Sequence, residues 1–572
     1  MLNRILLTFS NIAYSSIKAS QMKAIHSYIL FISICISLLS CKSPTPQADR
    51  IVMHANIWTG NKEQPRAEAL AIAGDTILAI GSSSEILKFK GSKTEIIDLQ
   101  GKFVSPGFIN SHVHLLMGGN SLLSVQLREV NSKQAFISKI AAFSKTLDAG
   151  TWIVEGNWDH TLWGGALPNK EWIDAKTQDN PVALYRMDGH MVFANSKALE
   201  LAGIDKNTPE VPNGTILRDS EGNPTGILKS NAMNLLLDKI PPMTANQKEK
   251  AIVAANNYFL AQGITSVHDV DSLGTLATAS ALLQQNKLKL RIYSAKPLNR
   301  WQEVATSEFK NSKWIKTGIV RGFVDGSLGS HTAAFKEPYS DQPSDSGFYI
   351  NSPDKIYEWI SKADAAKLHI QVHAIGDAAL HSLLNIYERV IKENGVRDRR
   401  LRIEHAQHLD PQDIKRFSEL GIIASVQPYH AIDDGRWAEE YIGTKRAKTT
   451  YAFRSLADAN TLLAFGSDWP VAPASPIYGI YAAVTRRTTD NKNPEGWIPE
   501  QKITAEEALQ AYTINGAFAS FDESTKGSLA VGKFADFVVL SVDITKATPD
   551  EILGIQVLAT YLGGEKVYFS KK

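Results

Sequence analysis

Residues 368–377 read LHIQVHAIGD, and residues 400–409 read RLRIEHAQHL. Each stretch is an apolar β-type run that ends in polar residues, and an amphipathic segment of helical character separates the two. A strand, a helix and a second strand in this order form a parallel β-α-β unit. The two stretches therefore predict a parallel α/β fold.

The same alternation continues on both sides of that pair. Ten candidate strands exceed the eight of a (β/α)8 TIM barrel, so we expect an α/β barrel over residues 107–523 with an insertion. We place the insertion at roughly 150–240, between the first and third barrel units. Thr504 with Glu507 is expected to open the last helix as a capping box, and Asp410 to cap a helix beginning at Pro411. The other candidate strands read FVSPGFINSHVHL, TWIVEGNW, PVALYRMD, GITSVHDV, LKLRIYSA, IVRGFVDG, IIASVQP and LLAFGSDWP.

The two ends of the chain have a different character from the middle. Residues 50–106 and 524–572 consist of short β segments with turn residues between them, such as EALAIAGDTILAIG and GSLAVGKFADFVVLS. Both ends are therefore expected to build one small composite β-sandwich.

The overall composition excludes several classes of protein. The 572 residues carry 61 Lys and Arg against 59 Asp and Glu, a balance that argues against a nucleic-acid partner. With 44% hydrophobic and 21% charged residues, the chain is not intrinsically disordered. Its two cysteines exclude a disulfide framework and a cysteine-rich metal site.

The N-terminal region has the pattern of an export signal. Residues 28–40 read YILFISICISLLS, an uncharged run shorter than the roughly 20 residues that span a bilayer. Cys41 follows, and the junction resembles a bacterial lipobox. We therefore predict a signal peptide over 1–40, a lipid on Cys41, and a tether over 41–49. This makes the protein an exported bacterial lipoprotein, anchored on the periplasmic side or at the cell surface. A plain signal peptide with a chance cysteine is the alternative.

Histidines gather where candidate strands end. His112 and His114 are two residues apart in a strand, so both imidazoles point to one face. His373, His405 and Asp468 each end another apolar run. In an α/β barrel such ends meet at the face that carries the active site. The pattern predicts a metal site that leaves a position for water, with Asp468 as the acid/base.

The order PGFxxxHxH, two later single histidines and a late SDWP resembles the amidohydrolase superfamily. Within it, GNWDHTLWGG, YRMDGHMVFAN, GITSVHD and DGSLGSHTAAFKEPYSD are similar to the amidohydrolase-3, YtcJ-like branch, over roughly residues 50–572. The resemblance implies a TIM barrel with a β-sandwich and a divalent metal, usually zinc. It also implies hydrolysis of a non-peptide C–N bond, of amide or N-acyl and N-formyl type, in a small molecule.

By position, the resemblance implies metal ligands from His112 and His114 on the first strand, His373 on the fifth, His405 on the sixth and Asp468 on the eighth. One position departs from the pattern. Relatives commonly carry a lysine, which carbon dioxide converts to a metal-bridging carbamate, where this chain has Arg321. A guanidinium stays protonated and forms no carbamate. We therefore expect one divalent metal per chain, with zinc favoured.

Further polar residues are candidates for substrate binding, with a structural turn or packing as the alternative for each. These residues are Asp188, His190, Asp325, His331, His160 and Trp158. Glu404 and Gln407 flank His405 and are expected to support it.

Two hypotheses from different classes remain open. The first is an exported metal-dependent amidohydrolase, with an esterase or lactonase on the same scaffold as its variant. The second is a lipid-anchored binding protein that has lost its chemistry, and only Arg321 favours it. The sequence names neither the substrate nor the oligomeric state.

Overall fold

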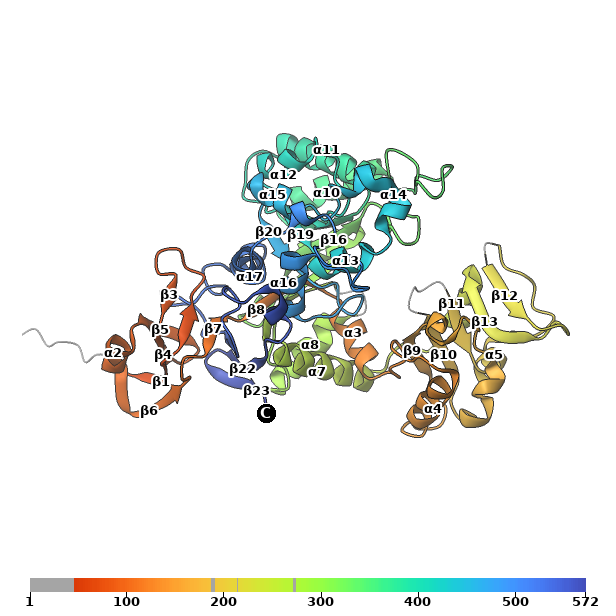
Figure 1. Cartoon of the computed structure of the whole chain (residues 1–572), viewed down its shortest axis with the longest axis horizontal. Helices are drawn as coiled ribbons and strands as arrows, with labels where there is room; N and C mark the ends of the chain where they lie inside the picture. The colour runs from red at the N-terminus through yellow and green to blue at the C-terminus, as the bar shows by residue number, and fades with distance from the viewer. Residues whose placement is uncertain (1–45, 187–190, 213, 271–273, 572) are drawn as a thin grey trace, which may run out of the picture.

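The computed structural model describes residues 46–186, 191–212, 214–270 and 274–571. Its centre is a parallel sheet in the order β20-β19-β18-β17-β16-β15-β14-β8, which lies between the small sheets of the chain ends and the insertion (Figure 1). Val113, at the end of the first strand, forms a parallel bridge with Trp469 just after the last strand. The sheet is thus a nearly closed barrel, and the predicted TIM-barrel fold is confirmed. Its strands are β8 (Phe108–Val113), β14 (Ile264–Val270), β15 (Arg291–Pro297), β16 (Ile315–Phe323), β17 (His369–Ala374), β18 (Arg402–His405), β19 (Ile423–Val426) and β20 (Leu463–Phe465).

The pair β17 and β18 shows why these residues form a barrel. All residues of both strands are buried, as expected for parallel strands covered on both faces. Helix α11 (Asp377–Asn394) connects the two strands. It buries one face with the i, i+3, i+4 spacing of an amphipathic helix, through Leu380, Leu383, Leu384, Tyr387 and Val390.

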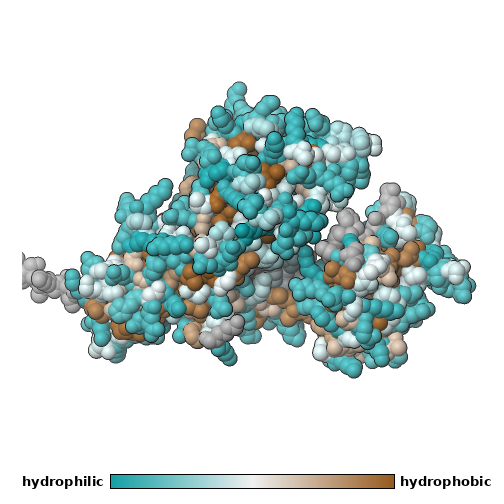
Figure 2. Space-filling model, in the orientation of Figure 1, coloured by the Kyte–Doolittle hydropathy of each residue, from teal (hydrophilic) through white to brown (hydrophobic). Residues whose placement is uncertain are grey.

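Two of the ten candidate strands belong to the insertion. A separate sheet in the order β12-β13-β11-β10-β9 lies in the chain between β8 and β14. The insertion therefore lies between the first and second barrel strands, within the range of roughly 150–240 expected from the sequence. Figure 2 shows it as a lobe beside the barrel with a mostly hydrophilic visible surface. Its strands are β9 (Ile153–Trp158), β10 (Val182–Arg186), β11 (Met191–Ala194), β12 (Gly214–Arg218) and β13 (Pro224–Ser230).

Both ends of the chain build two small sheets beside the barrel. Strand β7 of the N-terminal part pairs antiparallel with β21 of the C-terminal part, with Val104 opposite Val539. A hydrophobic cluster that includes Val52, Leu70 and Phe537 joins residues of the two sheets. One sheet holds β1 (Ala48–Met53), β4 (Ala69–Ala73), β5 (Thr76–Gly81) and β6 (Lys90–Asp98). The other holds β2 (Asn56–Trp58), β3 (Arg66–Ala67), β7 (Phe103–Pro106), β21 (Phe537–Leu540), β22 (Val557–Leu562) and β23 (Glu565–Phe569).

Two predicted helix starts have different outcomes. Thr504 and Glu507 form the expected capping box at α17 (Ala505–Ala511). The helix expected at Pro411 begins later, as α12 (Ile414–Glu419), and Asp410 instead accepts a hydrogen bond from the backbone of Gln412. Within the described ranges, no helix combines the length and the apolar character needed to cross a bilayer.

Candidate active site

The first and last barrel strands meet at the carboxyl end of the barrel. Gly466, just after β20, allows this approach, because a Cβ there would lie 2.7 Å from Cβ of His112. The backbone N–H of Asp468 then donates to the carbonyl oxygen of His112 (2.9 Å). As a result, Oδ1 of Asp468 lies 3.2 Å from Nε2 of His112 and 3.1 Å from Nε2 of His114.

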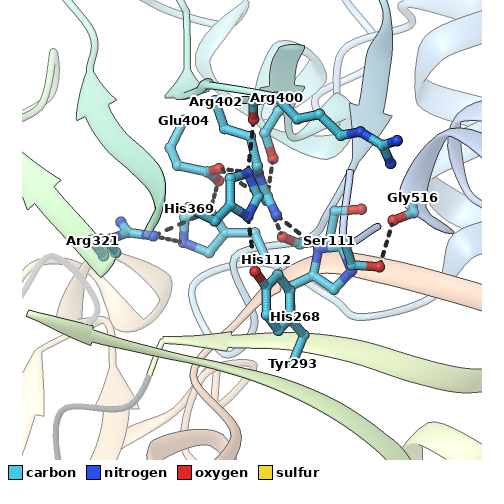
Figure 3. A network of polar contacts seen from close by, with 12 residues as sticks. Ser111, His112, His268, Tyr293, Arg321, His369, Arg400, Arg402, Glu404 and Gly516 are labelled. Carbon is cyan, nitrogen blue, oxygen red and sulfur yellow. Dashed lines mark hydrogen bonds and ion pairs between the residues drawn. The ribbon is translucent and has the colours of Figure 1, made fainter. Parts of the chain in front are cut away.

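His112 is held at both ring nitrogens. Its Nδ1 lies 2.6 Å from Oε2 of Glu404, and its Nε2 lies 2.6 Å from Nη1 of Arg321 (Figure 3). Arginine has no acceptor, so Nε2 of His112 accepts and its proton lies on Nδ1, toward Glu404. Arg321 is the β16 residue at the position where relatives carry lysine, and it is buried with its side chain in the site. The structure thus places the guanidinium against the first strand's histidine.

Asp468 is ionised in this setting. Burial by itself raises the pKa of Asp468, but its contact with His112 and the hydrogen bond from His114 outweigh burial. The net pKa lies well below that of an ordinary aspartate. A carboxylate among imidazoles at the barrel mouth can bind a cation or accept a proton.

Two further histidines complete the cluster. His405, at the end of β18, has its ring 5.1 Å from that of His112 and 4.5 Å from that of His373. Burial lowers the pKa of His405 well below its usual value, and burial with the charge of Arg321 lowers that of His373 to about 4. Both imidazoles are therefore neutral near pH 7. Nε2 of His373 donates to the carbonyl oxygen of Gly326 (3.0 Å), so this nitrogen is occupied by the protein.

The backbone is strained at the residues that carry these side chains. His405 and Asp468 have φ values of 72° and 59°, and Ala406 has 43°. Residues other than glycine rarely adopt this left-handed conformation, which persists where the surrounding structure enforces it and clusters at functional sites.

The cluster fits a divalent metal ion. One ligand atom each from His112, His405 and Asp468 lies within 4.8 Å of the others, and all three residues are buried. Nδ1 of His405 is buried without a hydrogen-bond partner among the described residues. Buried polar atoms are normally paired, so this nitrogen fits a metal ligand. Neutral imidazole with carboxylate is a donor set that suits zinc and similar metals.

A buried ion pair between Arg402 and Glu404 supports His112. Nη2 of Arg402 lies 2.9 Å from Oε1 of Glu404, and Nη1 of Arg402 lies 2.9 Å from Nδ1 of His268. Burial raises the pKa of Glu404, but Arg402 and His112 lower it to about 2 overall. Glu404 therefore supports His112 rather than the neighbouring His405, which corrects the expectation from sequence. The backbone carbonyl of Gln407 accepts a hydrogen bond from the backbone N–H of Tyr451.

Two of the predicted substrate residues have structural partners. Asp325 is buried and accepts hydrogen bonds from three backbone N–H groups, of Ala334, Ile375 and Gly376. Burial raises its pKa to about 7, although these bonds oppose the shift. Through these bonds Asp325 holds the loop beside His373, and its Oδ1 lies 3.7 Å from Nε2 of His373. His331 pairs with Asp341 (2.8 Å) and stacks on Tyr441.

The candidates in the insertion do not join the cluster. Trp158 is fully buried, packs against Phe136 and donates its indole N–H to the carbonyl of Leu184. It is a core residue, which corrects its predicted place in the pocket. Nε of Arg186 lies 3.3 Å from Nδ1 of His160. Asp188, His190 and Cys41 lie outside the described residues.

Sequence reasoning missed two residues after β19. Nε2 of Gln427 lies 3.3 Å from Nδ1 of His112, and its Oε1 is buried without a partner among the described residues. His430, in α13 (Pro428–Asp434), stacks parallel to His405 at 6.3 Å. Both follow an apolar strand, IIASVQP, which is the same signal that identified His373 and His405.

A cavity of about 560 Å³ adjoins this corner of the barrel. Tyr429, which precedes His430, and Pro470, which follows Asp468 by two residues, both line it. Tyr258, Tyr478 and Arg128 are also in its wall, as are Gly156 and Asn157 of the insertion. The cavity therefore lies between the barrel mouth and the insertion.

Comparisons with known proteins agree with this geometry. The chain is 39% identical to Protein LONG AFTER FAR-RED 3 of Arabidopsis thaliana, over 92% of this chain and 93% of the relative. It is 31% identical to YtcJ of Bacillus subtilis (90% and 98%) and 28% identical to N-substituted formamide deformylase of Arthrobacter pascens (91% and 98%). An uncharacterized metal-dependent hydrolase of Pyrococcus furiosus superposes with a TM-score of 0.73 at 30% identity, covering 87% of this chain and 100% of that one.

The His/His/Asp cluster at the mouth of the parallel barrel and these similarities identify a metal-dependent hydrolase. The amidohydrolase family model matches residues 95–568. The chain belongs to the amidohydrolase family, as the motifs in its sequence predicted.

Proposed function

We propose that this protein hydrolyses a non-peptide C–N bond, of amide, N-acyl or N-formyl type, in a small molecule. The observation that carries the proposal is the buried cluster of His112, His405 and Asp468, with Glu404 fixing the tautomer of His112. The similarity to N-substituted formamide deformylase supports the choice of bond.

One divalent metal, with zinc favoured, would be held by a subset of His112, His114, His373, His405 and Asp468. When bound, it supplies Lewis-acid activation of a water molecule. Asp468 then serves as the acid/base. Its Oδ1 lies near the imidazoles of His112 and His114, and it is ionised, so it has a free position for the proton that the attacking water loses.

The tyrosine-lined cavity supports a substrate with a sizeable substituent. Tyr429 and Tyr478 meet edge to face, with ring centroids 5.0 Å apart, and Tyr258 lines the same wall. Aromatic rings give large apolar contact area with a polar tip. A substituent with an aromatic or alkyl part suits such a wall, while the scissile group would lie at the histidine cluster.

One contact favours a second candidate, a binding protein with impaired chemistry. Arg321 occupies Nε2 of His112, the nitrogen that points toward Asp468. The unpartnered Nδ1 of His405 and the ionised Asp468 favour the hydrolase, because a binding protein has no need of them.

A substrate panel tests the proposal. Purified protein should release amine from members of a series of N-acyl and N-formyl amines, and chelation should abolish the release. Matched esters and lactones are measured beside the amides, because faster ester or lactone hydrolysis would indicate the alternative reaction on the same scaffold. Metal-loaded protein that binds amides and hydrolyses none of these compounds would instead indicate the binding protein.

We also propose that the protein is exported and anchored to a membrane by lipid on Cys41. The uncharged run over residues 28–40 and the following cysteine support this location.

A further inference from the structure

His430 is the imidazole at the barrel mouth that the predicted ligand set leaves unexplained. It lies in the first turn of α13, directly after the seventh barrel strand. Its Nε2 is buried and has no hydrogen-bond partner among the described residues. Buried polar atoms in folded proteins are almost always paired with protein, water or a ligand. This nitrogen is therefore available to a ligand that enters the site.

The position of His430 separates it from the compact cluster. Its ring lies parallel to that of His405, at an interplanar angle of 9° and a centroid distance of 6.3 Å. The group of atoms within 4.8 Å of one another contains His112, His405 and Asp468, and His430 is outside it. A metal held by that group accounts for the unpartnered nitrogen of His405 and leaves that of His430 to another ligand.

The residues around His430 place its imidazole beside the cavity that is proposed to hold the substrate. Tyr429, the preceding residue, lines the cavity beside the barrel mouth, together with Pro470. The first turn of α13 therefore borders both the cavity and the histidine cluster. Burial lowers the pKa of His430, although the charges of Asp468 and Asp433 oppose the shift. The imidazole is neutral near pH 7, and a neutral imidazole presents one N–H donor.

We propose that Nε2 of His430 donates a hydrogen bond to the carbonyl oxygen of the scissile group. The inference rests on the proposed function and adds a catalytic residue to it. The carbonyl oxygen gains negative charge as water attacks, and a fixed donor aimed at that oxygen stabilises the charge. Because the donor is uncharged, it adds no repulsion toward a cation in the neighbouring cluster.

The experiment compares His430→Ala and His430→Gln with the wild type for metal content, kcat and KM on whichever N-acyl or N-formyl amine the panel identifies. His430→Ala should retain the wild-type metal content and lose about 10²–10³-fold in kcat, the usual effect of deleting one such donor. His430→Gln keeps an N–H near the same position and should recover part of that loss. His381→Ala is the matched control, because that imidazole is half-exposed on α11 and pairs with Asp413.

Three outcomes would overturn the inference. Loss of metal from His430→Ala and His430→Gln would make His430 a ligand. An unchanged kcat in a folded His430→Ala protein would remove it from the reaction. A rise in KM alone, with kcat preserved, would make it a binding contact without a role in the transition state. A wild type inactive on the whole panel would instead contradict the proposed function, and the inference with it.

Discussion

The guanidinium of Arg321 lies 2.6 Å from Nε2 of His112 and takes the lone pair that a metal ion would use. Glu404 holds the other ring nitrogen, so His112 has no free nitrogen in this arrangement. A metal bound through His112 therefore requires the guanidinium to withdraw. The unpartnered Nε of Arg321 shows that its side chain is not fixed by hydrogen bonds at every nitrogen.

Arg321→Met should bind a divalent metal more tightly than the wild type. At an effective dielectric constant of about 20, two unit charges 4 Å apart interact by about 4 kcal/mol, and a dication doubles the repulsion. We expect at least about a tenfold lower Kd for zinc by competition with a chelator. Arg389→Met, at an exposed pair with Glu393, should leave the Kd unchanged. Weaker binding by Arg321→Met would show that Arg321 supports the metal site.

Asp468→Asn should keep the fold and much of the bound metal, and lose most of the turnover. Asparagine has nearly the same shape and can still contact the imidazoles, but it cannot accept a proton. Loss of a general base costs about 10²–10⁴ in rate. The measurement is kcat with the metal content determined on the same sample. Near wild-type kcat in a folded, metal-loaded variant would exclude Asp468 as the base.

The barrel could be predicted from the sequence because its strands are buried on both faces and so appear as apolar runs. Eight of the ten candidate runs are barrel strands, as β17 and β18 illustrate. The runs around Trp158 and Arg186 have the same character but form the separate sheet of the insertion. An apolar run indicates that a strand is buried, but it does not indicate which sheet the strand joins.

For the site as well, local sequence patterns predict the residues at strand ends but not the contacts between distant parts of the chain. Strand ends identified His112, His405 and Asp468, because parallel strands bring their carboxyl ends together. The support of His112 by Glu404 joins residues 292 positions apart, and no local pattern indicates that contact. The predicted pocket role of Trp158 is wrong because an aromatic residue near a histidine has the same sequence signature in a pocket as in a core.

Stability should fall between about pH 4 and pH 7 through Asp434. Burial raises the pKa of Asp434 to about 7 from 3.8, and the hydrogen bond from Tyr451 offsets part of the shift. The folded state keeps a proton that the unfolded chain releases near pH 4, so this contribution to the free energy of unfolding is lost as the pH rises through about 7. Asp434→Asn stays neutral and should avoid this loss.

The expected result is a difference in Tm between variant and wild type that grows in favour of Asp434→Asn from pH 5 to pH 8. A shift of about three units corresponds to an upper limit of about 4 kcal/mol. The reverse trend would mean that Asp434 is ionised and stabilised in the folded protein.

Cys41→Ala should abolish membrane association. A thioether-linked diacylglycerol with an amide-linked acyl chain buries more than one chain, which is enough for stable anchoring. The variant should fractionate as soluble or accumulate with its signal uncleaved, whereas the wild type should carry lipid by mass spectrometry. A soluble wild type with an N-terminus other than Cys41 would contradict the lipobox prediction.

Metal content measured together with turnover tests the central claim most directly. Protein purified without chelators and dialysed extensively should retain about one equivalent of a divalent metal per chain. Its hydrolysis of an N-acyl or N-formyl amine should disappear with chelation and return in proportion to the metal added back, up to that one equivalent. Activity that persists without metal, or that rises in proportion to a second tightly held equivalent, would contradict a single ion held by the cluster of His112, His405 and Asp468.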